Sequence, residues 1–169
     1  DKLHDLGFTG QGKLIAIFDA GFSNADTVSA YDSLWLAGRI LTWYDFVDRD
    51  TLLFQEDFHG EAVFSLIGAN LPGAFVGTAP HASYILARTE DVGSERHIEE
   101  DNWLEAVEWA DSIGADIITS SLGYSVFDPG EGDYSYLDMD GNTTIITNAA
   151  DFAASKGILV VSSAGNEGG

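Results

Sequence analysis

Three separated segments of this sequence carry side chains that can exchange a proton or donate a hydrogen bond. Asp19 ends the apolar run 13–19, His59 opens a second apolar stretch, and Asn166 lies in the Ser-Ala-Gly-Asn-Glu-Gly run 163–168. Carboxylates and imidazoles are common groups in proton transfer, and a side-chain amide can donate to a developing negative charge. These residue types therefore permit acid–base chemistry if the fold brings them together.

Each of the three segments also has an ordinary structural explanation. Asp19 could cap a turn, because aspartate and the glycine that follows at position 21 are typical turn residues. His59 could be an exposed residue at the start of a helix, and the glycine-rich run around Asn166 could be only a turn. Taken singly, none of them identifies a functional site.

The elements that must position these residues alternate between two patterns. Five apolar runs are continuous, as in strands buried on both faces, and they cover residues 13–19, 39–45, 83–88, 115–120 and 157–163. Between them, apolar residues at helical spacing predict helices over 59–69, 99–113 and 144–156. The segment 124–142 is rich in Gly, Asp and Tyr and is predicted to be a long surface loop.

This alternation predicts one α/β domain over residues 1–169, a doubly wound and mainly parallel sheet with helices on both faces. Reactive groups in such sheets lie at the carboxyl ends of the strands. That edge would contain Asp19 and the turns that follow Ser120 and Ser163.

The amino-acid composition limits the kinds of partner. The chain has 28 acidic against 7 basic side chains, a formal net charge of −21, which would repel nucleic acid. No apolar run reaches the roughly 18 residues of a membrane-spanning helix, so no membrane partner is expected. The N-terminus shows no signal-peptide pattern, and the absence of cysteine excludes disulfides and thiol catalysis.

In order and context, the three segments resemble the subtilase family of serine proteases, peptidase family S8. The Gly-Thr-Ala-Pro run 77–80 and the Ser-Leu-Gly run 121–123 resemble further motifs of that family. The resemblance extends from about residue 10 to residue 169. It implies the N-terminal part of a subtilisin-like catalytic domain, with the C-terminal portion missing, in a secreted or cell-envelope bacterial serine endopeptidase.

The resemblance assigns a catalytic role to each of the three residues. His59 would be the general base that takes the proton of a serine and returns it to the leaving amine. Asp19 would accept the other imidazole N–H and thereby fix the tautomer. Asn166 would donate its side-chain amide to the tetrahedral oxyanion.

The resemblance also implies where a polypeptide substrate would bind. Ser121, Leu122 and Gly123 would offer backbone hydrogen bonds to an extended peptide, which joins as an added strand. Ala164 and Gly165 would line the pocket for the residue before the scissile bond. No cofactor is required for this chemistry, and a structural calcium ion stays an open alternative.

The sequence departs from the family pattern at the nucleophile, at Glu61 and, more mildly, at Ala20, where Ser or Thr is common. The family's nucleophile lies in a Gly-Thr-Ser-Met-Ala-type motif, and no serine of residues 1–169 has that context. The chain alone is therefore expected to be inactive, and to associate with the missing C-terminal half or with itself through an open sheet edge. The second departure is Glu61, which stands where Thr or Ser is usual and is expected to point to solvent from the first turn of its helix.

Two further runs have the spacing of ligand-binding motifs. The run 7–13 has the Gly-x₄-Gly-Lys spacing of a phosphate loop, but Leu14 replaces the required Ser or Thr. The run 138–142 resembles the start of a calcium loop, but a turn leading to a helix cap at Thr143 is favoured. Two alternatives remain: an inactive subtilase-fold binding or maturation module, and an unrelated doubly wound domain that binds a nucleotide or small ligand. The second would require a glycine-rich turn after the first strand, where the run 20–22 supplies one glycine.

Overall fold

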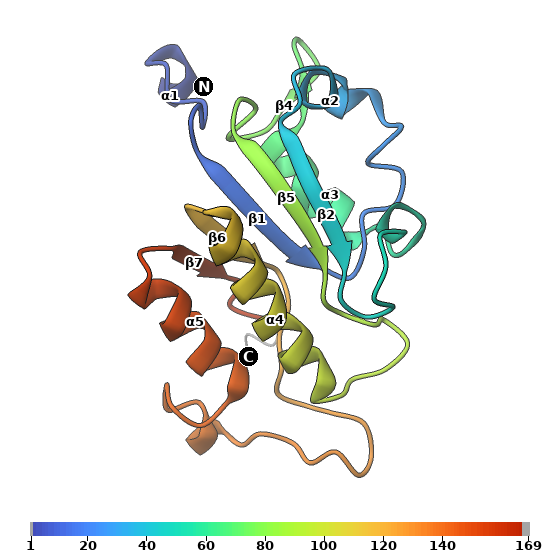
Figure 1. The fold of residues 1–169 in the computed structure, drawn as a ribbon, viewed down its shortest axis with the longest axis vertical. Coiled ribbons are helices and arrows are strands. Elements are labelled where there is room, and N and C mark those ends of the chain that lie inside the picture. The colour runs from blue at the N-terminus through green and yellow to red at the C-terminus, as the bar shows by residue number, and fades with distance from the viewer. Residues whose placement is uncertain (1, 167–169) are drawn as a thin grey trace.

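The computed structural model describes residues 2–166, and its centre is a five-stranded parallel sheet (Figure 1). The strands are β1 (Leu14–Asp19), β2 (Ile40–Asp45), β5 (Ser83–Arg88), β6 (Ile117–Ser120) and β7 (Leu159–Ser162). They lie in the order β2-β5-β1-β6-β7, and all four neighbouring pairs are parallel. The predicted doubly wound sheet is confirmed, and β1 is its central strand.

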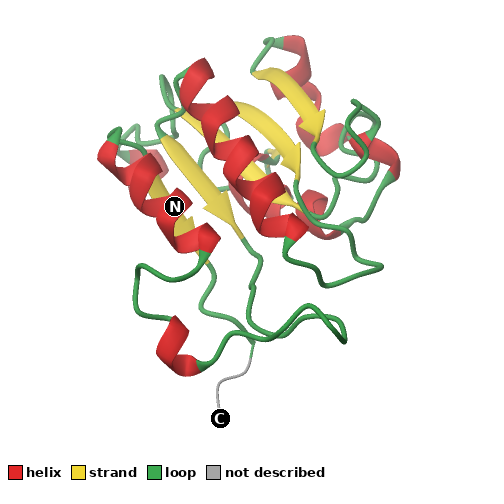
Figure 2. Cartoon of the chain, turned by 60° about the horizontal axis from the view of Figure 1, so that its bottom comes forward, coloured by secondary structure: helices red, strands yellow, loops and turns green. Residues whose placement is uncertain are grey.

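Helices cover both faces of this sheet. Helices α4 (Ile98–Ile113) and α5 (Ile145–Ser155) pack on one face and lie in front of the strands in Figure 2, whereas α3 (His59–Gly68) covers the opposite face. The three predicted helices are therefore present, with ends that differ from the prediction by one residue or less. Because side chains alternate along a strand, β1 contributes to the cores on both faces of the sheet.

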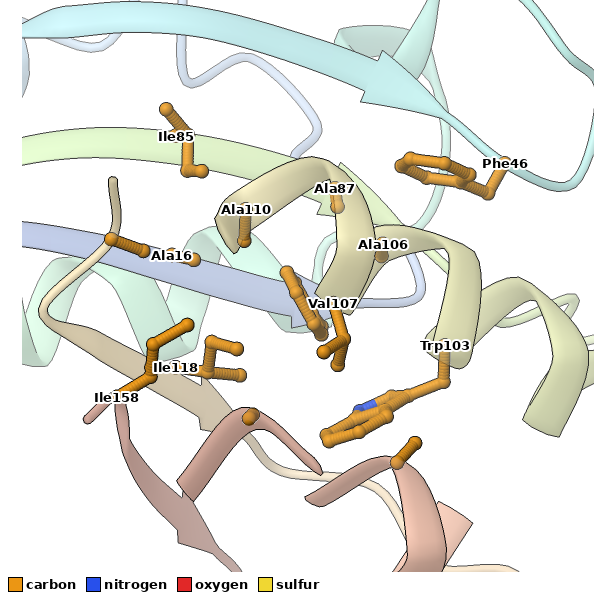
Figure 3. Close-up of a cluster of buried hydrophobic side chains, with 14 of the residues drawn as sticks. Ala16, Phe46, Ile85, Ala87, Trp103, Ala106, Val107, Ala110, Ile118 and Ile158 are labelled. Carbon is orange, nitrogen blue, oxygen red and sulfur yellow. The ribbon is translucent and has the colours of Figure 1, made fainter. Parts of the chain in front are cut away.

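The core under α4 connects that helix to the carboxyl end of the sheet. Trp103, Val107 and Ala110 of α4 point into the cluster shown in Figure 3. Trp103 is fully buried and meets the ring of Phe18 edge to face at 5.5 Å. Its indole N–H donates to the hydroxyl of Ser120 at 3.1 Å, so the polar atom of this large side chain is also satisfied.

Several short elements were not predicted from the sequence. They are α1 (Lys2–Asp5), α2 (Asp32–Leu36), the hairpin β3 (Asn70–Leu71) and β4 (Phe75–Val76), and 3₁₀ turns at Ser29–Tyr31, Leu53–Gln55 and Tyr136–Asp138. Each is too short to show a helical or alternating period. Apart from its 3₁₀ turn, the segment 124–142 is irregular, as predicted.

The predicted cap of α5 is one residue off. Thr144, not Thr143, has the extended backbone of an N-cap, and its hydroxyl accepts the N–H of Thr147 at 3.2 Å. Both threonines fit a cap by residue type, and only the backbone geometry distinguishes them.

The sheet has an uncovered edge at β7. Among the described residues β7 pairs only with β6, and Leu159 and Val161 are 59% and 46% exposed.

Within residues 2–166 no helix is long and apolar enough to cross a membrane.

Candidate active site

The first part of the site is a direct contact between Asp19 and His59. Asp19 ends the central strand β1, and His59 is the first residue of α3, which packs against that strand. The imidazole Nδ1 lies 2.6 Å from Oδ1 of Asp19, a hydrogen-bond distance. The Asp19 side chain is completely buried, whereas that of His59 is half exposed.

The glycine after His59 permits this contact. A Cβ atom at Gly60 would lie 2.4 Å from the carbonyl oxygen of Gly21 and 2.7 Å from Cβ of Asp19. No larger residue fits there without moving the start of α3 away from β1. The close packing of α3 against β1 therefore explains why glycine follows His59, independently of any chemical role of the histidine.

A second carboxylate orders the start of α3. Oδ1 of Asp57 accepts the backbone N–H of His59 at 2.8 Å, and the Asp57 carbonyl accepts the N–H of Ser23 at 3.2 Å. Asp57 thus joins the turn after β1 to the helix that carries the imidazole. Asp57 was not among the predicted site residues, although aspartates commonly accept the N–H two residues further along in a turn.

Burial determines the electrostatics of Asp19. Burial of the carboxylate raises the pKa of Asp19 above its usual value, while the hydrogen bond from His59 lowers this pKa. Oδ1 also accepts the N–H of Ala20 at 2.8 Å, whereas Oδ2 is buried without a hydrogen-bond partner among residues 2–166. The carboxylate therefore faces Nδ1 of the ring and leaves Nε2 as the atom that can accept a proton from elsewhere.

The second part of the site is a pocket of about 560 Å³ at the carboxyl ends of β6 and β7. Its lining includes six predicted site residues: Ser121, Leu122, Gly123, Ala164, Gly165 and Asn166. The register explains this, because Phe18 pairs with Ser120 and Ser120 pairs with Ser162, which aligns the ends of the three strands. The pocket and the Asp19–His59 pair therefore lie at the same edge of the sheet.

Hydrogen bonds hold the two strands of this pocket together. The N–H of Ser163 donates to the carbonyl of Ser120, and its hydroxyl donates to the carbonyl of Leu122, both at 3.1 Å. One of the predicted substrate-binding carbonyls thus already has a partner. The last part of the predicted Gly-Asn-Glu-Gly motif, Glu167 and Gly168, lies outside the described residues.

A group of glutamates beside the pocket was not predicted. Carboxylate oxygens of Glu90, Glu95 and Glu99 lie within 4.8 Å of one another, and Glu95 also lines the pocket. Burial and the neighbouring Glu99 raise the pKa of Glu90 to about 8, while a hydrogen bond from the hydroxyl of Tyr124 lowers it. Among the described residues, these three glutamates are close enough to supply oxygen ligands to one cation together. No periodic pattern in the sequence marks them.

Glu61 does not point freely into solvent, which corrects the expectation from the sequence. Its Oε1 accepts a hydrogen bond from the buried hydroxyl of Tyr31 at 2.8 Å, and its carbonyl accepts from the same hydroxyl at 3.0 Å. Burial, together with this carboxylate, raises the pKa of Tyr31. The glutamate therefore anchors α3 to the 3₁₀ turn at Ser29–Tyr31.

The two weaker motifs have structural partners. The ammonium of Lys13 donates to Asp116 at 2.8 Å, so the phosphate-loop lysine is engaged in an ion pair. In the run 138–142, Oδ1 of Asp140 accepts the N–H groups of Asn142 and Thr143 at 2.8 and 2.9 Å. This is the geometry of a turn, as the sequence favoured.

Comparison with known proteins gives one consistent family. A profile described as the Subtilase family matches residues 10–169. Subtilisin E of Bacillus subtilis is 31% identical over 98% of the chain, and the minor extracellular protease Vpr of the same species is 31% identical over 97%. The chain spans only 37% and 19% of these two relatives.

A solved structure gives the same fold. Fervidolysin from Fervidobacterium pennivorans, described as a keratinolytic enzyme related to subtilisin, superposes with a TM-score of 0.69 at 23% identity. The match covers 99% of this chain and 23% of fervidolysin. At this identity the likeness concerns the fold alone.

Proposed function

Because the chain belongs to the subtilase family of serine proteases, we propose that it supplies the aspartate and histidine of an Asp-His-Ser triad in a serine endopeptidase. The nucleophilic serine of this proposal lies outside residues 1–169. The observation that supports it most directly is the 2.6 Å contact between Nδ1 of His59 and the buried carboxylate of Asp19.

In the proposed reaction His59 moves one proton in each half. Its Nε2 takes the proton of the serine hydroxyl while the serine oxygen attacks the carbonyl carbon of the scissile bond. The imidazolium then gives this proton to the leaving amine as the C–N bond breaks and an acyl-enzyme forms. In the second half, water attacks the acyl-enzyme and gives a proton to Nε2 of His59. His59 returns this proton to the serine oxygen as the carboxylic acid product is released. Asp19 stabilises the imidazolium in both halves through Nδ1–H.

The pocket would bind the substrate and the oxyanion. The side-chain amide of Asn166 is assigned to the negatively charged oxygen of the tetrahedral intermediate. The backbone of Ser121 to Gly123 is assigned to an extended peptide, and this segment follows β6 outside any helix or strand. Ala164 and Gly165, both small, leave room for a side chain next to the scissile bond.

The remaining proposals concern the whole protein. Relatives such as Vpr favour a secreted or cell-envelope location, and the chemistry needs no metal, although a structural calcium ion would be compatible with the acidic surface. The natural partner of the open β7 edge is the C-terminal part of a subtilase domain.

The test is hydrolysis of a casein or peptide substrate by the complete protein that contains this chain. His59→Ala is expected to lower kcat by about 10⁶, the size of the loss measured in subtilisin itself. His81→Ala, at an exposed histidine outside the site, is the matched control and should retain full activity. A complete protein that binds peptides without cleaving them would instead favour the binding or maturation module.

A further inference from the structure

We propose that Arg88 is a positioning residue that fixes the geometry of the Asp19–His59 pair. Arg88 ends β5, the strand between β1 and β2, and lies in register with Asp19 on one side and Asp45 on the other. It therefore stands at the carboxyl edge of the sheet, directly beside the proposed catalytic aspartate. The kinetic part of this inference rests on the proposed function, and the geometric part does not.

The guanidinium of Arg88 is a buried charge held by two carboxylates. Its side chain is 6% exposed, and Nη1 donates to Asp45 at 2.8 Å and to Asp48 at 2.7 Å. Asp45 is itself buried and also accepts the N–H groups of Val47 and Asp48 through Oδ1. A buried charge is tolerated only with such partners, so this arrangement has little freedom to move.

From this fixed position, Arg88 reaches the chain next to Asp19. Its Nε donates to the carbonyl oxygen of Ala20 at 3.2 Å, while the N–H of Ala20 donates to Oδ1 of Asp19 at 2.8 Å. The residue after Asp19 is thus held at both of its backbone polar groups. Arg88 thereby constrains the turn that aims the carboxylate at the imidazole.

The same guanidinium also approaches the segment that leads to His59. Its Nη2 lies 3.6 Å from Oε2 of Glu56, which immediately precedes the Asp57 that caps the N–H of His59. One side chain therefore contacts the chain on both sides of the Asp19–His59 hydrogen bond. Arginine is suited to this because its planar fork presents five N–H donors in different directions, whereas lysine presents one point charge.

Arg88 does not line the pocket around Asn166, so its loss should affect proton transfer more than substrate binding. In the complete protein, Arg88→Lys keeps a positive charge beside Asp45 but removes the donor to Ala20. We expect kcat to fall about tenfold, since small misplacements of catalytic groups are costly, with KM changed less than about twofold. The low-field proton resonance of His59 Nδ1–H should also broaden or shift.

Arg49→Lys is the control, because Arg49 pairs with Glu105 at the surface, and it should leave the kinetics and the resonance unchanged. Arg88→Lys with the wild-type resonance and kcat would overturn the proposal.

If the Arg88→Lys variant does not fold, Asp48→Asn is the variant that tests the proposal. Asp48 is 60% exposed and is one of the two carboxylates that accept from Nη1 of Arg88. Loss of its charge should weaken the Nδ1–H resonance of His59, and an unchanged resonance would count against the inference. A wild-type protein without turnover would refute the proposed function, while the resonance would still test Arg88.

Discussion

At the scale of single residues, burial decides how the polar groups near the site can act. Asp19 is completely buried and Glu90 nearly so, but only Asp19 has an imidazole as its hydrogen-bond partner. Burial alone makes the ionised form of each carboxylate costly. The hydrogen bond to His59 offsets part of that cost for Asp19, although burial still raises its pKa, whereas Glu90 has the hydroxyl of Tyr124 and lies near the carboxylates of Glu99 and Glu95.

Asn166 allows a prediction about the oxyanion. Replacing Asn166 with Ala in the complete protein should lower kcat by about 10²–10³ and leave KM nearly unchanged, because the amide is assigned to a charge present only in the transition state. That magnitude is the one measured in subtilisin for the corresponding donor. Steady-state kinetics on a peptide substrate measure both constants. A rise in KM at constant kcat would assign Asn166 to substrate binding instead.

Glu90 allows a prediction about pH. Its pKa is raised from 4.5 to about 8 in the folded protein, so the native state binds this proton more tightly than the unfolded chain does. Stability from this group is therefore complete below pH 4.5 and is lost as the pH rises through 8, by a few kcal/mol in total at about 1.4 kcal/mol per pKa unit.

Glu90→Gln removes this titration and keeps an acceptor for Tyr124. Denaturant unfolding of the variant should show a smaller loss of stability between pH 5 and pH 9 than unfolding of the wild type. Asp101→Asn, at an exposed residue of α4, is the matched control and should retain the wild-type slope. Equal slopes for Glu90→Gln and wild type would show that Glu90 is ionised throughout.

At the scale of elements, continuous apolar runs predicted all five parallel strands, because a strand buried on both faces has no polar alternation. The resemblance to the subtilase family implied the contact between Asp19 and His59, and the rule for open α/β sheets placed Asp19 and the turns after Ser120 and Ser163 at one edge. The contacts of Arg88 and the glutamate group could not be predicted. Arg88 contacts residues of β2 and of the segments after β1 and β2 that are adjacent to it only in space. The three glutamates lie between β5 and the first turn of α4, where single carboxylates carry no periodic signal.

The N-cap of α5 permits a test at this scale. Thr144 is 1% exposed, and its hydroxyl accepts the N–H of Thr147. The first turns of α5 line a second cavity together with Ala164 and Gly165. Thr144→Ala should reduce the free energy of unfolding by about 1 kcal/mol, and Thr144→Ser should restore most of it. Thr143→Ala is the control and should have a much smaller effect. Equal losses at both positions would contradict the assigned cap.

At the scale of the whole molecule, two properties oppose each other. The net charge of −21 disfavours association, whereas the open β7 edge with exposed Leu159 and Val161 favours it. Salt screens the charges but leaves the apolar edge unchanged. Association of the 169-residue chain should therefore become stronger as ionic strength rises.

Light scattering at several salt concentrations measures this association. The 169-residue chain is expected to self-associate, and Val161→Lys should reduce association by placing a charge on the edge strand. Ser155→Lys, at an exposed position of α5, adds the same charge away from the edge and serves as the control. A monodisperse monomer at high salt would contradict the expectation that this edge needs a partner.

If Asp19 and His59 activate a serine outside residues 1–169, that serine should be unusually reactive in the complete protein. Covalent labelling of the complete protein with a fluorophosphonate, followed by peptide mapping, measures this reactivity, because the reagent reacts with activated serines. We expect a label on one serine outside residues 1–169, lost in His59→Ala and retained in His81→Ala. No label on the wild-type protein, or a label that persists in His59→Ala, would contradict it.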